Sequence, residues 1–298
     1  MSFPVDYDHA HPLWFGGALP VTTGYDESAA IILPVPLDRT TSYVQGTRNG
    51  PRELILASAQ VELWDEELGV DIHPRGIHTL PEMDLSHGSM EGAMARIHRT
   101  ASAIMDSGKF LVTLGGEHSI TPPLVAAAAA RHPGLTVLQI DAHADLRDGY
   151  MGEHNSHASA MRRSLESAPV VQVGIRNILK EEAEAVPSLQ TTIFYDWNMR
   201  DDPDWMSRVL DALTGPVYLT IDLDGLEPGL MPAVGTPEPG GLAWRELMTL
   251  LRRVFTERDV VACDVVELCP IPGVWSPNFV AARLVYKLIT YKLALPRT

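Results

Sequence analysis

The sequence predicts an α/β protein whose core is a mostly parallel sheet. From about residue 29 onward, short runs rich in β-branched residues alternate with longer stretches of helical pattern, as in successive β-α-β units. Several of the short runs are apolar without a gap, which is typical of strands covered by helices on both faces. The chain has 298 residues, of which 45% are hydrophobic and 20% charged, so a packed core of this kind is expected.

Seven apolar runs are the predicted strands. Each is short, and each contains at least two large apolar residues in succession, which suits a buried strand. They cover residues 29–36, 109–116, 135–143, 169–176, 191–197, 216–224 and 260–268.

The predicted helices lie between or after these strands. The second contains five consecutive alanines, the residue with the highest helix propensity, so we interpret it as a closely packed helix. The six helices cover residues 90–106, 122–131, 179–185, 203–213, 244–256 and 278–293. No repeat, flexible linker or block of like charge interrupts the series. We therefore expect one catalytic domain over residues 29–298, preceded by an N-terminal arm over residues 1–28.

Charge and hydropathy limit the partners of the protein. The formal net charge is −15, from 23 basic and 38 acidic side chains, which disfavours binding to nucleic-acid phosphates. No apolar stretch reaches the ~18 residues of a membrane helix, and the N-terminus lacks the basic and apolar segments of a signal peptide. The two cysteines, Cys263 and Cys269, suit free thiols in a reducing compartment. We expect a cytoplasmic protein with no nucleic-acid or membrane partner.

Acidic and histidine side chains follow four of the predicted strands. In a parallel sheet the ligand site lies beyond the carboxyl ends of the strands, so these residues are expected to meet in one cleft. They are His118, Asp141, His143, Asp145, Asp222, Asp224 and Glu267. Five carboxylates gathered in one cleft could not stay ionised without cations.

The spacing within this set indicates metal ions. In DAHAD (141–145) the three polar side chains alternate, so they would share one face of an extended segment. Asp222 and Asp224 repeat this spacing. Four aspartates and two histidines without a thiolate suit a hard divalent ion such as Mn²⁺, and they are too many for one ion that also holds a water. The residues therefore predict two ions that share bridging carboxylates.

Four motifs give the chain a resemblance to the ureohydrolase family, which contains arginases and agmatinases. They are GGEHSITPP (115–123), DAHADL (141–146), SHASAMRR (156–163) and TIDLDGLEPGLMPAVGTPEPGG (220–241), in that family's order and approximate spacing. The resemblance extends over about residues 30–293, and SHASAMRR makes the chain most like the agmatinases. It implies an arginase-like three-layer fold with about eight mostly parallel strands flanked by helices, assembled as a homotrimer or homohexamer.

The resemblance also implies a binuclear centre with two Mn²⁺ per subunit. Six residues would be its ligands: His118 and Asp145 for one ion, His143 and Asp224 for the other, and Asp141 and Asp222 as bridges. Glu227 replaces an aspartate of the family pattern that is not a ligand, so we expect an altered loop and retained activity.

The implied reaction is hydrolysis of a guanidinium group. An activated water attacks the guanidinium carbon, and the product breaks down to urea and an amine. Asp145 would accept a hydrogen bond from that water, Glu267 would bind the planar N–H fork of the substrate, and His157 would contact the substrate and pass a proton to the departing amine. We interpret the nearby His154 as a loop histidine.

The identity of the substrate leaves alternatives open. We expect agmatine, a cation that would yield putrescine and urea in polyamine biosynthesis. Arg147 stands near the pocket mouth where arginases carry an asparagine that reads a carboxylate, which counts against arginine. It would repel the ammonium of agmatine unless Asp148, Glu153 or another acid neutralises it, so a guanidinobutyrase or other guanidino-acid ureohydrolase is the alternative. Arginase activity ranks lower, as does a non-catalytic family member, because all six ligands are present.

Overall fold

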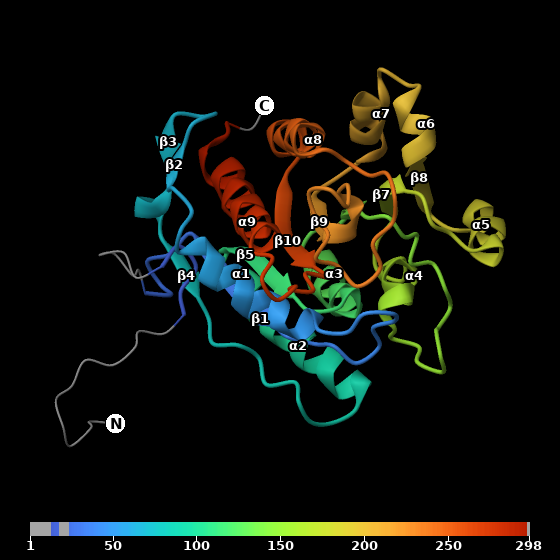
Figure 1. The fold of residues 1–298 in the computed structure, drawn as a ribbon, viewed down its shortest axis with the longest axis horizontal. Coiled ribbons are helices and arrows are strands. Elements are labelled where there is room, and N and C mark those ends of the chain that lie inside the picture. Colours follow the sequence, from blue (N-terminus) through green and yellow to red (C-terminus); the bar gives the residue numbers. More distant parts are fainter. Residues whose placement is uncertain (1–12, 18–23, 297–298) are drawn as a thin grey trace.

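The computed structural model describes residues 13–17 and 24–296, and its centre is an eight-stranded sheet (Figure 1). The strand order is β4-β1-β5-β10-β9-β6-β7-β8, and every neighbouring pair is parallel. The strands are β1 (Ala30–Val35), β4 (Ile77–Thr79), β5 (Phe110–Gly115), β6 (Thr136–Ile140), β7 (Val170–Ile175), β8 (Thr191–Tyr195), β9 (Val217–Asp222) and β10 (Val260–Val266). A separate antiparallel pair consists of β2 (Trp64–Asp65) and β3 (Val70–Asp71). The predicted α/β class with about eight strands is confirmed.

Helices cover both faces of this sheet and complete three layers (Figure 1). Alternate residues of a strand point to opposite faces, so Ile31 and Ile32 of β1 belong to different core clusters. The Ile31 side is covered by α2 (Met90–Asp106), α3 (Thr121–Ala129) and α4 (Ala160–Ser164). The Ile32 side is covered by α1 (Gly50–Ser58), α7 (Trp205–Ala212), α8 (Trp244–Glu257) and α9 (Ser276–Ala294). The short helices α5 (Lys180–Ala185) and α6 (Asp196–Arg200) follow β7 and β8.

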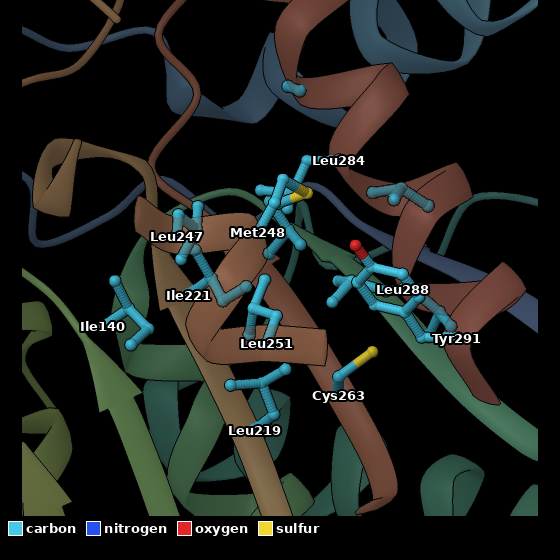
Figure 2. Close-up of a cluster of buried hydrophobic side chains, with 14 of the residues drawn as sticks. Ile140, Leu219, Ile221, Leu247, Met248, Leu251, Cys263, Leu284, Leu288 and Tyr291 are labelled. Carbon is cyan, nitrogen blue, oxygen red and sulfur yellow. The ribbon is translucent and has the colours of Figure 1, made fainter. Parts of the chain in front are cut away.

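The larger core cluster lies between the central strands and the helices α8 and α9 (Figure 2). Ile221 of β9 and Leu247 and Leu251 of α8 are fully buried there. Burying one such side chain stabilises the fold by about 1.5–3 kcal/mol, so this cluster contributes much of the stability of the central sheet. Both cysteines, Cys263 and Cys269, are buried as free thiols.

The structure contains several short elements that are not expected from the sequence. β4 has only three residues, and its pairing with β1 is what makes it a strand. Helix α1 begins with Gly50 and Pro51, residues that also suit a turn, although proline is well tolerated in a first helical turn. The hairpin of β2 and β3 and the helix α4 are missed as well. The predicted strand 191–197 ends at Tyr195 because α6 begins at Asp196.

The described part of the predicted arm packs against the domain. Phe15 is buried, and its N–H donates to Oγ1 of Thr79 at 2.9 Å. Residues 1–12 and 18–23 of the arm lie outside the described residues. Within residues 13–17 and 24–296, no helix is both long and apolar enough to span a bilayer.

A buried ion pair joins α9 to the β2–β3 hairpin. Nζ of Lys287 lies 2.8 Å from Oδ2 of Asp65 and 2.6 Å from Oε2 of Glu67. The hydroxyl of Tyr291 donates to the same Glu67 oxygen at 2.7 Å. Lys287 is 3% exposed and Asp65 is 0% exposed, so each charge depends on the other for compensation.

Lys287→Met is expected to lower the free energy of unfolding by about 3–5 kcal/mol, because it leaves the Asp65 carboxylate buried without its cation. Urea denaturation measures this loss. Lys180→Met is the matched control, since Lys180 forms an exposed i,i+4 pair with Glu184. That pair is expected to contribute about 0.5 kcal/mol or less. Equal losses in the two variants would contradict this account of the ion pair.

Candidate active site

All seven residues predicted at the strand ends lie at one edge of the sheet. They come from β5, β6, β9 and β10, which occupy the four adjacent places β5-β10-β9-β6. β5 and β6 are consecutive in the chain, but β10 and β9 lie between them in the sheet. Where the order of strands in the sheet departs from their order in the chain in this way, a cleft opens at the carboxyl ends of the strands. The structure therefore brings the predicted set together.

The alternating side chains of DAHAD (141–145) and DLD (222–224) are brought together by turns, and not by the extended segment expected from the sequence. β6 ends at Ile140, and Oδ1 of Asp141 accepts the N–H of His143 at 2.6 Å. Oδ1 of Asp222 accepts the N–H of Asp224 at 2.9 Å in the same manner. An aspartate that bonds the N–H two residues on bends the chain, so both side chains of each pair face one small volume.

Glycine permits close approach of these two turns. A Cβ at Gly225 would lie 2.8 Å from the backbone nitrogen of Asp141, closer than real side chains allow. Across the same contact, the N–H of Ala142 donates to Oδ1 of Asp224 at 3.0 Å. The turn after β9 is thus attached directly to the turn after β6.

The first group of candidate ligands surrounds Nδ1 of His118. This nitrogen lies 3.1 Å from Oδ2 of Asp141, 3.0 Å from Oδ2 of Asp145 and 3.4 Å from Oδ2 of Asp222. His118 begins a short 3₁₀ turn after β5, and all four residues are buried. The imidazole nitrogen and the carboxylates of Asp141 and Asp145 converge here within the range of a single ion, with Asp222 beside them.

The second group surrounds Nδ1 of His143. This nitrogen lies 2.9 Å from Oδ2 of Asp224 and 3.7 Å from Oδ1 of Asp141. Asp141 therefore contributes one oxygen to each group, whereas the contact given by Asp222 is with His118. The geometry is that of two neighbouring positions that share Asp141.

The hydrogen bonds of His118 fit a metal ligand. Its Nε2 lies 2.9 Å from Oγ1 of Thr220, whose hydroxyl donates to Oδ1 of Asp264 at 2.6 Å. Because that hydroxyl gives its proton to Asp264, Nε2 must carry the imidazole proton, which leaves a lone pair on Nδ1. Nδ1 is buried and has no hydrogen-bond partner among the described residues. A lone pair aimed at three carboxylate oxygens requires a cation or a proton between them.

The electrostatics indicate the same need for positive charge. Burial raises the pKa of four carboxyl groups, those of Asp145, Asp222, Asp224 and Glu267. For Asp145 the pKa rises to about 7, with burial as the main cause and the charge of Asp141 as the next. Burial also opposes ionisation of Asp141, but His118 and His143 hold its pKa below the ordinary value. Burial likewise disfavours the charged form of His143, yet Asp224 and Asp141 raise its pKa to about 12.

A cavity of about 180 Å³ opens above these groups. Glu267 faces it and is held by the N–H of His118, which donates to its Oε1 at 2.7 Å. Asp145 and Glu267 have φ angles of 52° and 66°, a left-handed backbone that non-glycine residues rarely adopt. Such strain persists where the surrounding structure enforces it, which is common at functional sites.

His157 also lines the cavity, with Nε2 at 3.3 Å from Oγ of Ser42. Burial, followed by the positive charges of His118, His143 and Arg147, lowers its pKa to about 4. His157 is therefore an uncharged base at pH 7. His154 contacts Arg163 instead.

Sequence reasoning missed the loop that positions His157. Glu117 is fully buried, and its carboxylate accepts the N–H groups of Arg39 and Thr40 at 2.7 and 2.6 Å. Oγ1 of Thr40 accepts the N–H of His157 at 2.9 Å, and Ser42 follows in the same loop. The buried acid before His118 in GGEHS was the available signal, but no pattern connects it to residues 39–42.

Arg147 lies in the cavity wall with its guanidinium 4.4 Å from the centre of the Tyr150 ring. Asp148, a predicted neutralising acid, pairs with Arg163 instead. Glu153, the other, accepts the N–H of Asn155. Within the described part of the chain, Arg147 takes part in no ion pair. Glu227 is exposed after β9 and is not among the clustered acids.

The fold and site define an α/β protein with a candidate two-ion centre of aspartates and histidines at a parallel sheet edge. The family model described as "Arginase family" matches residues 28–290. The chain is 40% identical to an N(1)-aminopropylagmatine ureohydrolase of Synechocystis sp., with 90% of each chain covered. It is 32% identical to a Bacillus anthracis agmatinase, covering 83% of this chain and 86% of the relative. The solved agmatine ureohydrolase of Thermoplasma volcanium matches with a TM-score of 0.83 and 30% identity, over 91% of this chain and 92% of that one.

The chain belongs to the arginase family, and it is an agmatinase-like ureohydrolase. The family predicted from the four sequence motifs is thereby confirmed.

Metal-free protein is expected to lose stability as the pH rises from 6 to 8. The raised pKa values of Asp145 and His143 mean that the folded chain keeps protons that the unfolded chain has released in this range. The expected loss is about 1–3 kcal/mol. Saturating Mn²⁺ is expected to remove or reverse this slope, because metal ligands must be deprotonated. Calorimetric melting at pH 6, 7 and 8, with chelator or with Mn²⁺, tests this. The same slope under both conditions would contradict it.

Proposed function

We propose that the chain uses two Mn²⁺ per subunit to hydrolyse an amine-ended guanidine, releasing urea and the amine. The observation that carries this proposal is the pair of His–Asp groups that share Asp141 beside the buried carboxylate of Glu267. Agmatine is the first substrate candidate, and its products would be putrescine and urea. The assembly and location proposed are those expected from the sequence, a cytoplasmic homotrimer or homohexamer.

The proposed ligands are those expected from the sequence: His118 and Asp145 for one ion, His143 and Asp224 for the other, and Asp141 and Asp222 as bridges. Support comes from the short distances between the imidazole Nδ1 atoms and the carboxylate oxygens. A set of hard oxygen donors with two imidazoles and no thiolate suits Mn²⁺. When bound, the two ions would lower the pKa of a water and so supply the nucleophile at neutral pH.

Three side chains would act on the substrate and the water. Glu267 has one oxygen bonded to the N–H of His118, and both of its oxygens keep a lone pair that can accept from the guanidinium fork. Asp145 would accept a hydrogen bond from the attacking water and orient it. His157 is uncharged at pH 7, so it would first take up a proton and then deliver it to the departing amine nitrogen.

A second substrate candidate is N(1)-aminopropylagmatine, which carries a longer cationic tail. The higher identity to the Synechocystis relative, 40% against 32% for the Bacillus agmatinase, favours it. Both candidates need an acid beyond the guanidinium. Glu238 lines the cavity, where its Oε1 accepts from Asn177 and lies 3.9 Å from Nε2 of His143. A carboxylate tail would instead require Arg147, which keeps guanidinobutyrate as the alternative.

Urea release from a panel of guanidines tests the substrate assignment. The Mn²⁺-loaded protein is expected to prefer agmatine or N(1)-aminopropylagmatine over guanidinobutyrate and arginine by about 100-fold or more in kcat/KM, because a mismatched tail leaves a charge unpaired. The ratio of the two amines decides between the first and second candidates. Arg147→Gln is expected to raise kcat/KM for the amines. Faster hydrolysis of guanidinobutyrate than of either amine would overturn the amine assignment while leaving the chemistry intact.

Two variants separate metal binding from substrate binding. Asp141→Asn is expected to lose both ions, because Asp141 contributes an oxygen to each group. Glu267→Gln is expected to keep its manganese and to lose about 10²-fold or more in kcat/KM, since it removes only the guanidinium contact. Elemental analysis and urea assays measure the two effects, with Asp84→Asn in an exposed loop as control. Loss of manganese from Glu267→Gln would mean that Glu267 is a ligand.

A further inference from the structure

Two buried glutamines link β8, the outermost strand of the sheet, to Asp141 through hydrogen bonds. Oγ1 of Thr191 in β8 lies 3.0 Å from Oε1 of Gln172 in β7. Nε2 of Gln172 donates to Oε1 of Gln139 in β6 at 2.5 Å. Nε2 of Gln139 then donates to Oδ2 of Asp141 at 2.6 Å. Gln139 and Gln172 are paired in register and are 0% exposed.

The chemistry of the groups fixes the direction of this chain. An ionised carboxylate only accepts hydrogen bonds, so Gln139 must turn its NH₂ group toward Asp141. Its carbonyl oxygen then needs a donor, and Gln172 supplies one. Rotating either amide by a half-turn would set two acceptors against each other. Donors aligned in one direction polarise one another, which strengthens the last bond, the one to Asp141.

The same two amides hold the backbone of DAHAD. The second hydrogen of Gln139 Nε2 faces the carbonyl oxygen of His143 at 3.3 Å. The second hydrogen of Gln172 Nε2 bonds the carbonyl oxygen of Ala144 at 2.7 Å. Ala144 directly precedes Asp145, whose φ is 52°. The glutamines therefore restrain the strained part of the turn together with the Asp141 side chain.

These contacts use part of the hydrogen-bonding capacity of the Asp141 carboxylate and leave a defined number of lone pairs free. Oδ1 accepts the N–H of His143, and Oδ2 accepts the amide of Gln139. Each oxygen keeps one lone-pair direction. Oδ1 is the oxygen near Nδ1 of His143, and Oδ2 is the oxygen near Nδ1 of His118. Each oxygen thus keeps one lone pair and has a different histidine nitrogen near it, which is what a bridge between two cations requires.

We propose that Gln139, supported by Gln172, is a positioning residue that holds Asp141 in the orientation that bridges two divalent ions. This inference rests on the proposed function, because it requires those two ions. An amide suits the task better than Lys or Arg, since it restrains the carboxylate without placing a competing positive charge beside the metals.

Titration of Mn²⁺ into the chelator-stripped full-length protein, followed by calorimetry and by EPR, tests the proposal. Gln139→Met keeps the size of the side chain and removes its donors. It is expected to weaken Mn²⁺ binding by about 10–100-fold and to increase the EPR signal of uncoupled Mn²⁺. Gln172→Met is expected to cause a smaller loss. Thr136→Val is the control, because Thr136 is a buried polar residue of the same strand, and within the described residues its hydroxyl has no partner.

Wild-type affinity for both ions in Gln139→Met would overturn the proposal, even if the chelated variant melted at a lower temperature. Should Gln139→Met fail to fold, wild-type affinity in Gln172→Met would overturn it instead. An equal loss in Thr136→Val would also overturn it, because the effect would then belong to the strand. Wild-type protein that binds fewer than two Mn²⁺ would contradict the proposed function itself, and this result is distinct from all of the others.

Discussion

Repulsion among buried carboxylates is the constraint on which the rest of the site depends. Asp141 lies between His118 and His143, and the other acids surround the same small volume. Burial raises the pKa of Asp145 and Asp222, and at Asp141 the effect of burial is outweighed by His118 and His143, which lower the pKa of that carboxyl group. A cluster of buried acids at the sheet edge is stable only if cations bind there or if some of the carboxyl groups stay protonated.

Most of the restraint on these acids comes from uncharged donors. The N–H of Ala142 bonds Asp224, and the N–H of His143 bonds Asp141. The carboxyl group of Asp264 acts on His118 through the hydroxyl of Thr220, which lies between them. Uncharged donors orient a ligand carboxylate without occupying the position of a cation. The negative charge of the centre therefore stays available to a bound cation.

The parts of this site that the sequence could predict are those encoded locally. β6 and β9, which lie within the predicted runs 135–143 and 216–224, are strands buried on both faces, and an acid at the carboxyl end of a parallel strand must lie at that edge of the sheet. The contact between Glu117 and Thr40 joins residues 77 positions apart, and nothing in either segment encodes it. β4 is a strand only because β1 is beside it. The pKa of His157 likewise depends on neighbours that only the fold brings near.

The charges of the cavity wall give a direction to any substrate tail. Arg147 covers the face of Tyr150, which would otherwise be a surface for an ammonium, and both belong to the side of the cavity near His157. Glu238 belongs to the side near His143. If every substrate binds its guanidinium group beside Glu267, an amine tail would extend toward Glu238 and a carboxylate tail would extend toward Arg147. The net charge of −15 favours cations throughout the approach, so Arg147 acts locally against the field of the whole protein. Under the proposed function, selection among tails would therefore depend on two side chains of opposite charge, with the same hydrolysis of the guanidinium group for every tail.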